Sequence, residues 1–297
     1  MRREHLCFWV AVCTILCLAA PPACGQTHLE RSEEIRAAVP KQPTVKPSRT
    51  HKILMLSYQS HTAGRLAGEA ALQIMAENTG AFSVEFIRDK NALAESLMPE
   101  NLKKYDAVCV NNSTGGQGDA NNGKTLVENL DEYVLGGGNL IGIHAATDNR
   151  FGAVFGWFFS GHPWSGKVAV KIDEPEHPLC KVFEGKGFWT NDEIYQFSKG
   201  VYTREKLRVL LSLDMNAVKK KGSREDDDNA VAWIKNHGKG RVFYCSLGHN
   251  PRAFQDPKIV RFLLDGIQFA LGDLKADATP SAQLAAKPTP APAPAED

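Results

Sequence analysis

The sequence predicts an α/β protein built on a mostly parallel sheet with helices on both faces. Short, nearly continuous apolar runs alternate with helical patterns in the first half of the chain. Such runs are typical of strands that are buried on both sides. The second half is richer in strands and closes with an amphipathic helix, so we expect it to add strands to the same sheet.

Each expected element follows from its local pattern. The runs 52–57 (KILMLS) and 139–143 (NLIGI) are apolar, whereas 82–88 (FSVEFIR) alternates as a half-buried strand does. The two helical segments carry apolar residues at helical spacing and stop at glycine. In order, we predict a strand at 52–57, a helix at 65–78, strands at 82–88 and 105–111, a helix at 124–135, strands at 139–143, 167–172, 193–197, 208–214, 230–234 and 241–246, and a helix at 258–271.

The first 25 residues have the parts of a secretory signal peptide. Two arginines precede the apolar run 6–20, and small residues follow a pair of prolines. The apolar run is too short for a permanent membrane anchor. We therefore expect an exported protein, periplasmic or extracellular, with no integral membrane segment after cleavage near residue 25. Acylation of Cys24, which would make a lipoprotein, is less favoured because the residues before it, Pro-Pro-Ala, lack the preferred aliphatic residue.

The remainder divides into three segments. Residues 26–50 are polar, contain three prolines and predict a flexible leader. Residues 51–272 make up the α/β domain. Residues 273–297 are rich in proline and alanine, which predicts a disordered, solvated tail.

Composition argues against nucleic-acid binding and against a disulfide-linked fold. A net charge of +1 without a clustered basic face gives no reason to expect nucleic acid as a partner. Outside the signal peptide only Cys109, Cys180 and Cys245 remain, and their spacing resembles no disulfide framework. We expect them to be buried, unreactive thiols. The sequence is compatible with a homo-oligomer and leaves the oligomeric state open.

The segment Gly142–Ala146 places a histidine where a strand turns into small residues. Such a turn lifts its central side chain out of the sheet, as a nucleophile elbow does. His144 stands at this position, and a histidine there can act as a base or bind a metal. Asp148 lies four residues further on and is a candidate to orient His144 or to join it in catalysis.

Further candidate residues follow other strands. His249 ends the run 241–246, His162 stands before a proline, and Glu193 and Tyr195 open another strand. In parallel sheets, ligands bind beyond the carboxyl ends of the strands, so we expect His144 and His249 to share a site. His61 follows the first strand and would fall at the same edge. A lone histidine at a strand end is more often a hydrogen-bonded structural residue, and this remains the alternative for each.

Two chemistries fit these residue types. Imidazole and carboxylate ligands suit one divalent metal, zinc or a similar ion, held by His144, His162, Glu193 and His249. The same groups without a metal would serve as an acid–base pair. The candidate substrate-binding residues are His162, Tyr195, Trp164 and Asn250, and Trp157, Trp189 and Phe159 are further candidates for stacking on sugar rings, although aromatic residues in an α/β core more often serve packing.

Several motifs occur in an order that resembles the ThuA-like, or trehalose-utilisation, family. The GGG-x-L-x-GIH and GRVFY-x-x-LGH pieces are specific in combination. The motifs are GGGNLIGIHAATD (136–148), SGHP (160–163), HP (177–178), DEIYQF (192–197) and GKGRVFYCSLGH (238–249). The resemblance covers about 52–272. After the first strand, SYQSHTAGR lacks the family's aromatic-rich stretch, which leaves His61 a doubtful member of the site.

The resemblance implies a class I glutamine amidotransferase-like fold, a flavodoxin-like three-layer sandwich. In the amidotransferases a cysteine stands at the elbow where this chain has His144, and a Pro-Glu pair follows a late histidine where this chain has Asn250 and Pro251. The residue types therefore exclude glutaminase chemistry.

The resemblance also implies a role in the metabolism of trehalose, other disaccharides or keto-sugars. The ligand we expect is a small sugar or keto-sugar, and a hydrolase, isomerase or lyase is compatible with the site. The alternatives are a non-catalytic glycan-binding module of the cell envelope and a domain with a vestigial site that acts through a partner. Fold alone does not decide among them.

Overall fold

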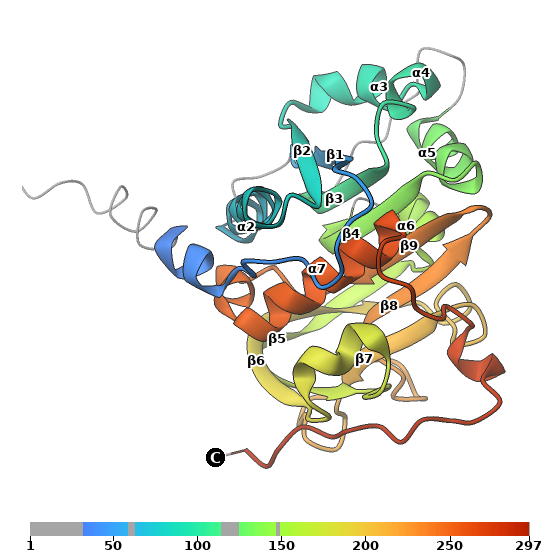
Figure 1. Cartoon of the computed structure of the whole chain (residues 1–297). Helices are drawn as coiled ribbons and strands as arrows, with labels where there is room; N and C mark the ends of the chain where they lie inside the picture. The colour runs from blue at the N-terminus through green and yellow to red at the C-terminus, as the bar shows by residue number, and fades with distance from the viewer. Residues whose placement is uncertain (1–31, 59–62, 114–124, 147–148, 297) are drawn as a thin grey trace, which may run out of the picture.

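The computed structural model describes residues 32–58, 63–113, 125–146 and 149–296. Over these residues the chain forms one nine-stranded sheet with helices on both faces (Figure 1). This is the predicted flavodoxin-like α/β architecture. The helices are α2 (Ala63–Thr79), α3 (Leu93–Ser96), α4 (Pro99–Leu102), α5 (Leu126–Leu135), α6 (Asn149–Phe155) and α7 (Pro257–Leu271), with short 3-10 turns η1 (Lys90–Ala92), η2 (Pro178–Phe183), η3 (Pro251–Gln255) and η4 (Ser281–Gln283).

The strands divide the sheet into a parallel and an antiparallel half. The strands are β1 (His51–Leu56), β2 (Phe82–Ile87), β3 (Ala107–Ser113), β4 (Asn139–Ala146), β5 (Phe159–Ile172), β6 (Phe188–Phe197), β7 (Arg208–Leu213), β8 (Ala230–His237) and β9 (Gly240–Cys245). The order β2-β1-β3-β4-β9 is parallel, and β9-β8-β7-β5-β6 is antiparallel. Every residue of β3 and β4 is buried, which explains their continuous apolar runs.

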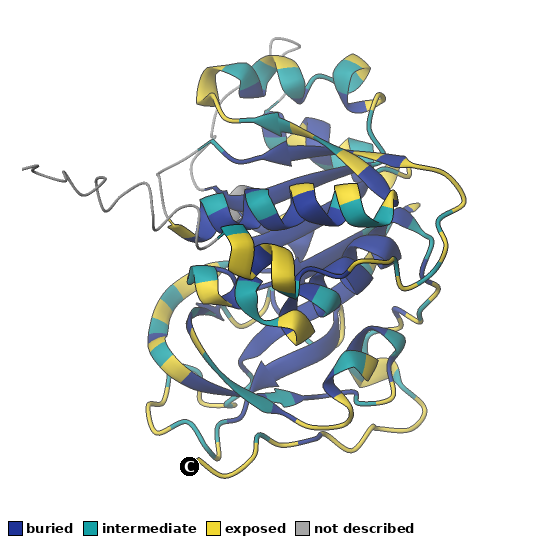
Figure 2. Ribbon diagram, turned by 60° about the vertical axis from the view of Figure 1, so that its left-hand side comes forward, coloured by how far each residue is buried: buried dark blue, intermediate teal, exposed yellow. Residues whose placement is uncertain are grey.

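The helices form two layers that bury the two faces of the sheet. One apolar cluster gathers side chains of α2 and α7, and the other gathers side chains of α3, α4, α5 and α6. Figure 2 shows the strands as a buried layer between helices whose outer surfaces are exposed. The closing helix α7 begins at Pro257, capped by the Asp256 side chain, and ends at Gly272 in the left-handed conformation, which glycine adopts without strain.

The antiparallel half differs from the prediction in one respect that matters for the site. β5 and β6 are much longer than expected and pair with each other from Phe159 and Phe197 to Val170 and Phe188. β6 lies last in the strand order, yet its residues contact the segment after β9: Ser246 Oγ accepts a hydrogen bond from the Tyr195 backbone N–H at 3.3 Å. The sheet therefore curls, and β6 reaches the carboxyl end of the parallel half.

The described part of the segment before β1, residues 32–50, contacts the domain, whereas the sequence predicted a flexible leader over 26–50. Residues 32–38 are helical, and Ile35 and Val39 are 2% exposed within the cluster that includes α2 and α7. Gln268 accepts a hydrogen bond from the Thr44 backbone at 2.8 Å. The polar composition of this segment predicted flexibility, but its few apolar side chains are buried against the domain rather than against one another.

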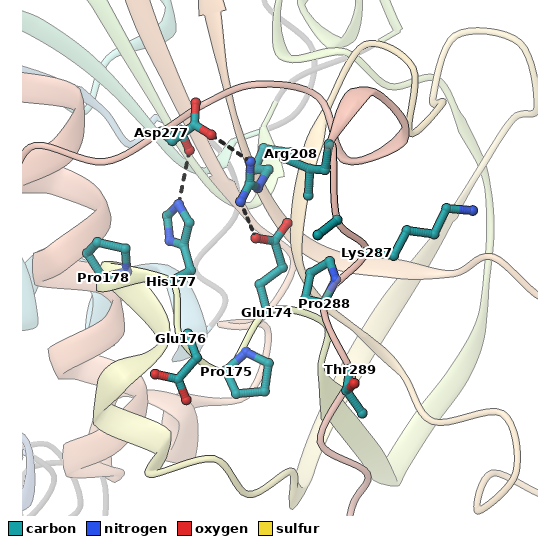
Figure 3. Close-up of a pocket in the computed structure, with 12 residues that line it drawn as sticks. Glu174, Pro175, Glu176, His177, Pro178, Arg208, Asp277, Lys287, Pro288 and Thr289 are labelled. Atoms are coloured by element: carbon teal, nitrogen blue, oxygen red, sulfur yellow. Dashed lines mark hydrogen bonds and ion pairs between the residues drawn. The ribbon is translucent and has the colours of Figure 1, made fainter.

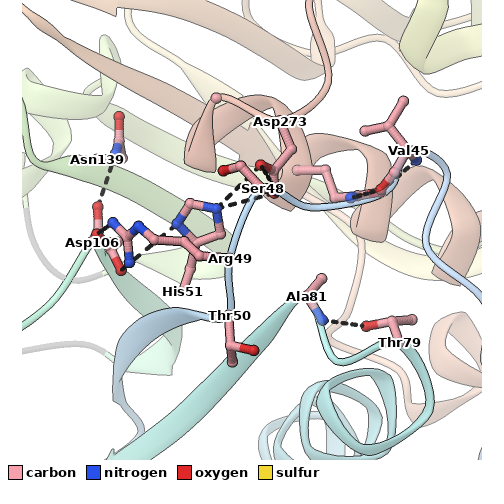
Figure 4. A network of polar contacts seen from close by, with 12 residues as sticks. Val45, Ser48, Arg49, Thr50, His51, Thr79, Ala81, Asp106, Asn139 and Asp273 are labelled. Carbon is pink, nitrogen blue, oxygen red and sulfur yellow. Dashed lines mark hydrogen bonds and ion pairs between the residues drawn. The ribbon is translucent and has the colours of Figure 1, made fainter.

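Charged groups also tie this segment to the domain (Figure 4). Arg49 forms an ion pair with Asp106, which precedes β3. The buried His51 places Nε2 3.1 Å from Asp273, which follows α7. Residues 26–31 and the expected signal peptide lie outside the described residues.

The described part of the segment after α7, residues 273–296, also contacts the domain at several points, whereas the sequence predicted a disordered tail over 273–297. Ala291 and Ile172 of β5 exchange backbone hydrogen bonds of 2.8 and 2.9 Å. Buried Arg208 pairs with Glu174 and, at 3.0 Å, with Asp277 (Figure 3). A Pro/Ala-rich segment cannot form a core of its own, but it can add to an existing edge.

Two further expectations concern thiols and membranes. Cys109, Cys180 and Cys245 are buried and free, as predicted. Burial raises the pKa of the Cys245 thiol to about 12. Within the described ranges, no helix is both long and apolar enough to cross a membrane.

Candidate functional site

His144 occupies a strained position at the carboxyl end of β4. Its φ is +53°, in the left-handed region that non-glycine residues rarely adopt, so the backbone turns here as the elbow pattern predicted. The side chain is 1% exposed. Nδ1 lies 2.8 Å from the Ser246 carbonyl, which can only accept a hydrogen bond, and Nδ1 therefore carries the proton. When the ring carries no second proton, its Nε2 lone pair is available to a ligand.

Gly142, two residues before His144, allows the Phe155 ring of α6 to pack closely against β4. A Cβ at Gly142 would lie 2.6 Å from the Phe155 ring, so a larger residue would displace α6 from the strand. The Tyr244 hydroxyl donates to the His144 carbonyl at 2.8 Å and fixes the turned peptide.

His249 comes from the loop after β9 and meets His144. β4 and β9 are parallel neighbours, with Ile143 opposite Cys245, so their carboxyl ends lie together as predicted. His249 Nδ1 is 3.2 Å from His144 Nε2, and the ring centroids are 5.0 Å apart. The His249 side chain is 45% exposed, so the pair opens to solvent on its side.

Glu193 of β6 completes a triangle with the two histidines. Its Oε1 lies 3.6 Å from His144 Nε2 and 3.6 Å from His249 Nδ1. The contact with His144 lowers the pKa of Glu193, burial opposes this shift, and positive charge on His249, His144 and His162, when these rings are protonated, reinforces it. The carboxylate is therefore ionised beside two imidazole nitrogens.

The three donor atoms fit the ligand shell of one small metal ion. Ligands about 2.1 Å from a tetrahedral zinc are about 3.4 Å from one another. The observed separations of 3.2, 3.6 and 3.6 Å match this edge length. The second ring nitrogen of His144 donates to a backbone carbonyl, an arrangement typical of metal-binding histidines. Among the described residues, these are the three whose donor atoms group in this way.

Asp192 holds two of the three donors in place. It is buried, its Oδ2 accepts from the Gly248 N–H at 2.7 Å, and its Oδ1 accepts from the Asn250 N–H at 2.8 Å. These bonds clamp both sides of His249. Oδ1 also accepts from the Glu193 N–H at 2.9 Å. Burial raises the pKa of Asp192, and the backbone hydrogen bonds and the charge of His144 oppose this shift.

Sequence reasoning noted Asp192 beside Glu193 without assigning it a role. The sequence held one signal: in a strand, Asp192 shares a face with Ile194, and the structure shows that this face is buried while Glu193 and Tyr195 are half-buried. A carboxylate on the buried face requires partners. The backbone donors of a distant loop that supply them are invisible in the sequence.

His162 and Tyr195 surround the triangle. His162 Nδ1 lies 3.6 Å from Glu193 Oε2, and its side chain is 59% exposed. The Tyr195 ring centroid is 4.4 Å from that of His144. Phe159, which is 39% exposed, stacks on His162 with centroids 5.9 Å apart.

The remaining predicted residues lie apart or serve the structure. Trp164 is buried, and its Nε1 donates to the Lys220 carbonyl at 2.7 Å. The Asn250 side chain caps η3 by accepting from the Arg252 N–H. Trp157 is part of the core. Asp148 and His61 lie outside the described residues.

A family model for trehalose utilisation, ThuA, matches residues 52–270. The chain belongs to the ThuA family. The description of that family gives the protein a carbohydrate-related role.

One solved structure supports the fold of this ThuA protein, and a second is similar at a lower score. A ThuA-like protein from Bacteroides uniformis is 21% identical with a TM-score of 0.58, over 76% of this chain and 92% of that chain. The cytoplasmic protein STM3548 from Salmonella typhimurium is 12% identical with a TM-score of 0.49, over 74% and 98%. A search among curated proteins found no match.

Proposed function

We propose that this ThuA protein binds one divalent metal, zinc or a similar ion, and acts on a sugar or keto-sugar there. The observation that carries the proposal is the donor triangle of His144 Nε2, Glu193 Oε1 and His249 Nδ1, whose edges suit a tetrahedral ion. Three protein ligands leave a fourth position for a sugar oxygen, which is the pattern of catalytic rather than structural metal sites.

The metal would polarise a sugar carbonyl or hydroxyl as a Lewis acid. The residues of the chain would divide the remaining tasks. His162 is solvent-accessible beside Glu193 and is placed to exchange a proton with the ligand. Phe159 and Tyr195, with ring centroids 4.8 Å apart, offer apolar surface on which a sugar ring can lie.

The second candidate is acid–base chemistry without a metal. The ionised Glu193 beside the His144–His249 pair favours it, because such a group can hold and pass a proton next to a keto function. A non-catalytic glycan-binding module would use the same groups as hydrogen-bonding partners.

Metal analysis of the purified protein tests the proposal. We expect about one equivalent of zinc or a similar ion per chain, and loss of that ion in His144→Ala and Glu193→Gln. His237→Gln is the matched control, since His237, the last residue of β8, pairs with Asp131 of α5 and is not one of the three donors. A wild-type protein without stoichiometric metal after zinc loading would leave only the metal-free candidates. Turnover of trehalose and 3-keto-disaccharides would then separate catalysis from binding.

We also propose that the chain is exported, on the strength of the charged, apolar and small-residue parts of its first 25 residues. Sequencing of the amino terminus of the protein recovered from its native cells should begin after Gly25. A terminus that retains residues 6–20 would contradict export by cleavage.

A further inference from the structure

A pocket adjoins the donor triangle through the side chain of His162. It has a volume of about 340 Å³, within the range of small-ligand sites. His162 lines it and also faces Glu193, so the two sites share this side chain. The other lining residues that matter here are Trp164, Lys167, Trp189, Lys219 and Lys220.

The cationic side of this pocket is built on a fixed framework. Trp164 Nε1 donates to the Lys220 carbonyl, which anchors the loop between β7 and β8. Gly222 of that loop sits so close to Trp164 that a Cβ would lie 2.8 Å from the ring. Lys167 of β5 places Nζ 5.0 Å from the Trp189 ring centroid. Three lysines therefore meet at a pocket with two tryptophans, which favours an anion with an apolar face.

A carboxylate of the chain itself already lies in this pocket. Glu296 lines the pocket, and its Oε1 lies 3.4 Å from Lys167 Nζ. The segment reaches this place because the Trp189 Nε1–H donates to the Pro294 carbonyl at 2.9 Å. Both charged side chains of the Glu296–Lys167 pair are about half exposed, at 42% and 52%. Such a pair stabilises little, so an external carboxylate can displace it.

We propose that this pocket binds the carboxylate of an acidic sugar unit, a uronate, whose neighbouring sugar lies at the His144–Glu193–His249 site. Glu296 is the internal competitor for the same position. The proposal rests on the proposed function for the identity of the ligand as a sugar. It does not require a bound metal, since the lysines and tryptophans are separate from the donor triangle.

Binding of a matched pair of disaccharides tests this proposal. Cellobiouronic acid carries a carboxylate where cellobiose carries a hydroxymethyl group. We expect calorimetry on the full chain at low salt to show binding of the acid severalfold tighter than that of cellobiose, because the acid gains a contact with half-exposed Lys167. Lys167→Gln should weaken binding of the acid severalfold and leave cellobiose unchanged. Lys181→Gln, an exposed lysine of η2, is the control.

Competition by the tail gives an independent readout. Glu296→Gln should tighten binding of cellobiouronic acid severalfold, and the gain should vanish in the Lys167→Gln background. Equal binding of the two disaccharides, no binding of either, or no effect of Glu296→Gln would overturn the proposal. Metal content is measured on the same samples. A metal-free protein that still prefers the acid would contradict the proposed metal site and support this pocket.

Discussion

At the scale of single residues, the candidate site depends on one buried carboxylate as much as on its three donors. Asp192 accepts hydrogen bonds from Gly248 and Asn250, and these bonds hold His249 within 3.2 Å of His144. A loop held on both sides of a ligand loses little conformational freedom when the ligand binds.

Asp192→Asn should therefore weaken metal binding by about 10–100-fold. One carboxylate oxygen becomes an NH2 group, which cannot accept from a backbone N–H, and the loop is released. Zinc titration against a chromophoric chelator measures the effect, with thermal unfolding to confirm the fold. Asp226→Asn, at an exposed aspartate outside the site, is the control. An unchanged dissociation constant would mean that Asp192 does not position His249.

The left-handed backbone of His144 gives a second residue-scale prediction. Both His144→Gly and His144→Ala remove the donor atom, but only glycine adopts a φ of +53° without strain. We expect the glycine variant to be more stable than the alanine variant by about 0.5–1 kcal/mol. Urea unfolding of the two variants measures the difference. Greater stability of the alanine variant would show that the turn carries no strain.

At the scale of elements, η2 offers a test of pH dependence. His177 Nδ1 accepts a hydrogen bond from the Leu179 N–H, so Nδ1 carries no proton. Nε2 lies 3.1 Å from the Asp277 carbonyl and donates to it. The pKa of His177 is lowered to about 4: burial is the main cause, the hydrogen bond to the Asp277 carbonyl opposes it, and the charge of Arg208 adds to it.

The unfolded chain takes up this proton near pH 6.5 and the folded chain only near pH 4. The unfolded state thus binds more protons between these values, and stability rises with pH across this window. His177→Asn retains a capping side chain without a titrating group. Its free energy of unfolding should vary less between pH 4 and 7 than that of the wild type, by up to about 3 kcal/mol. Parallel curves for both proteins would contradict the assignment.

Elements were predictable to the extent that their patterns were local. The strands at β4 and β9 were apolar runs, and parallel pairing then predicted that His144 and His249 would meet. The full length of β5 and β6 was not visible, because register shifts between Phe159 and Trp164 interrupt the alternation. The return of β6 to the loop after β9 depends on the curl of the whole sheet, so the contact of Asp192 with Gly248 could not be inferred.

At the scale of the whole molecule, side chains from the segments on either side of the domain join its core, among them Ile35 and Ala291. Ile35→Ala should destabilise the protein by about 2–4 kcal/mol, as buried large-to-small changes do. Leu135→Ala, at a residue that is 43% exposed, should stay within about 0.5 kcal/mol. Chemical unfolding of the full chain measures both. An unaffected Ile35→Ala variant would restore the view of residues 26–50 as a passive leader.

Because the sheet must curl to bring the three donor residues together, the protein can bind a metal ion only after this part of the fold has formed. His144 and His249 are 105 positions apart, and Glu193 arrives only with the outermost antiparallel strand. A nascent or partly folded chain therefore presents isolated imidazoles and no chelating trio. An ion bound after folding would link β4, β6 and the loop after β9, which are far apart in the sequence, so that its release should precede the opening of this edge when the protein is denatured.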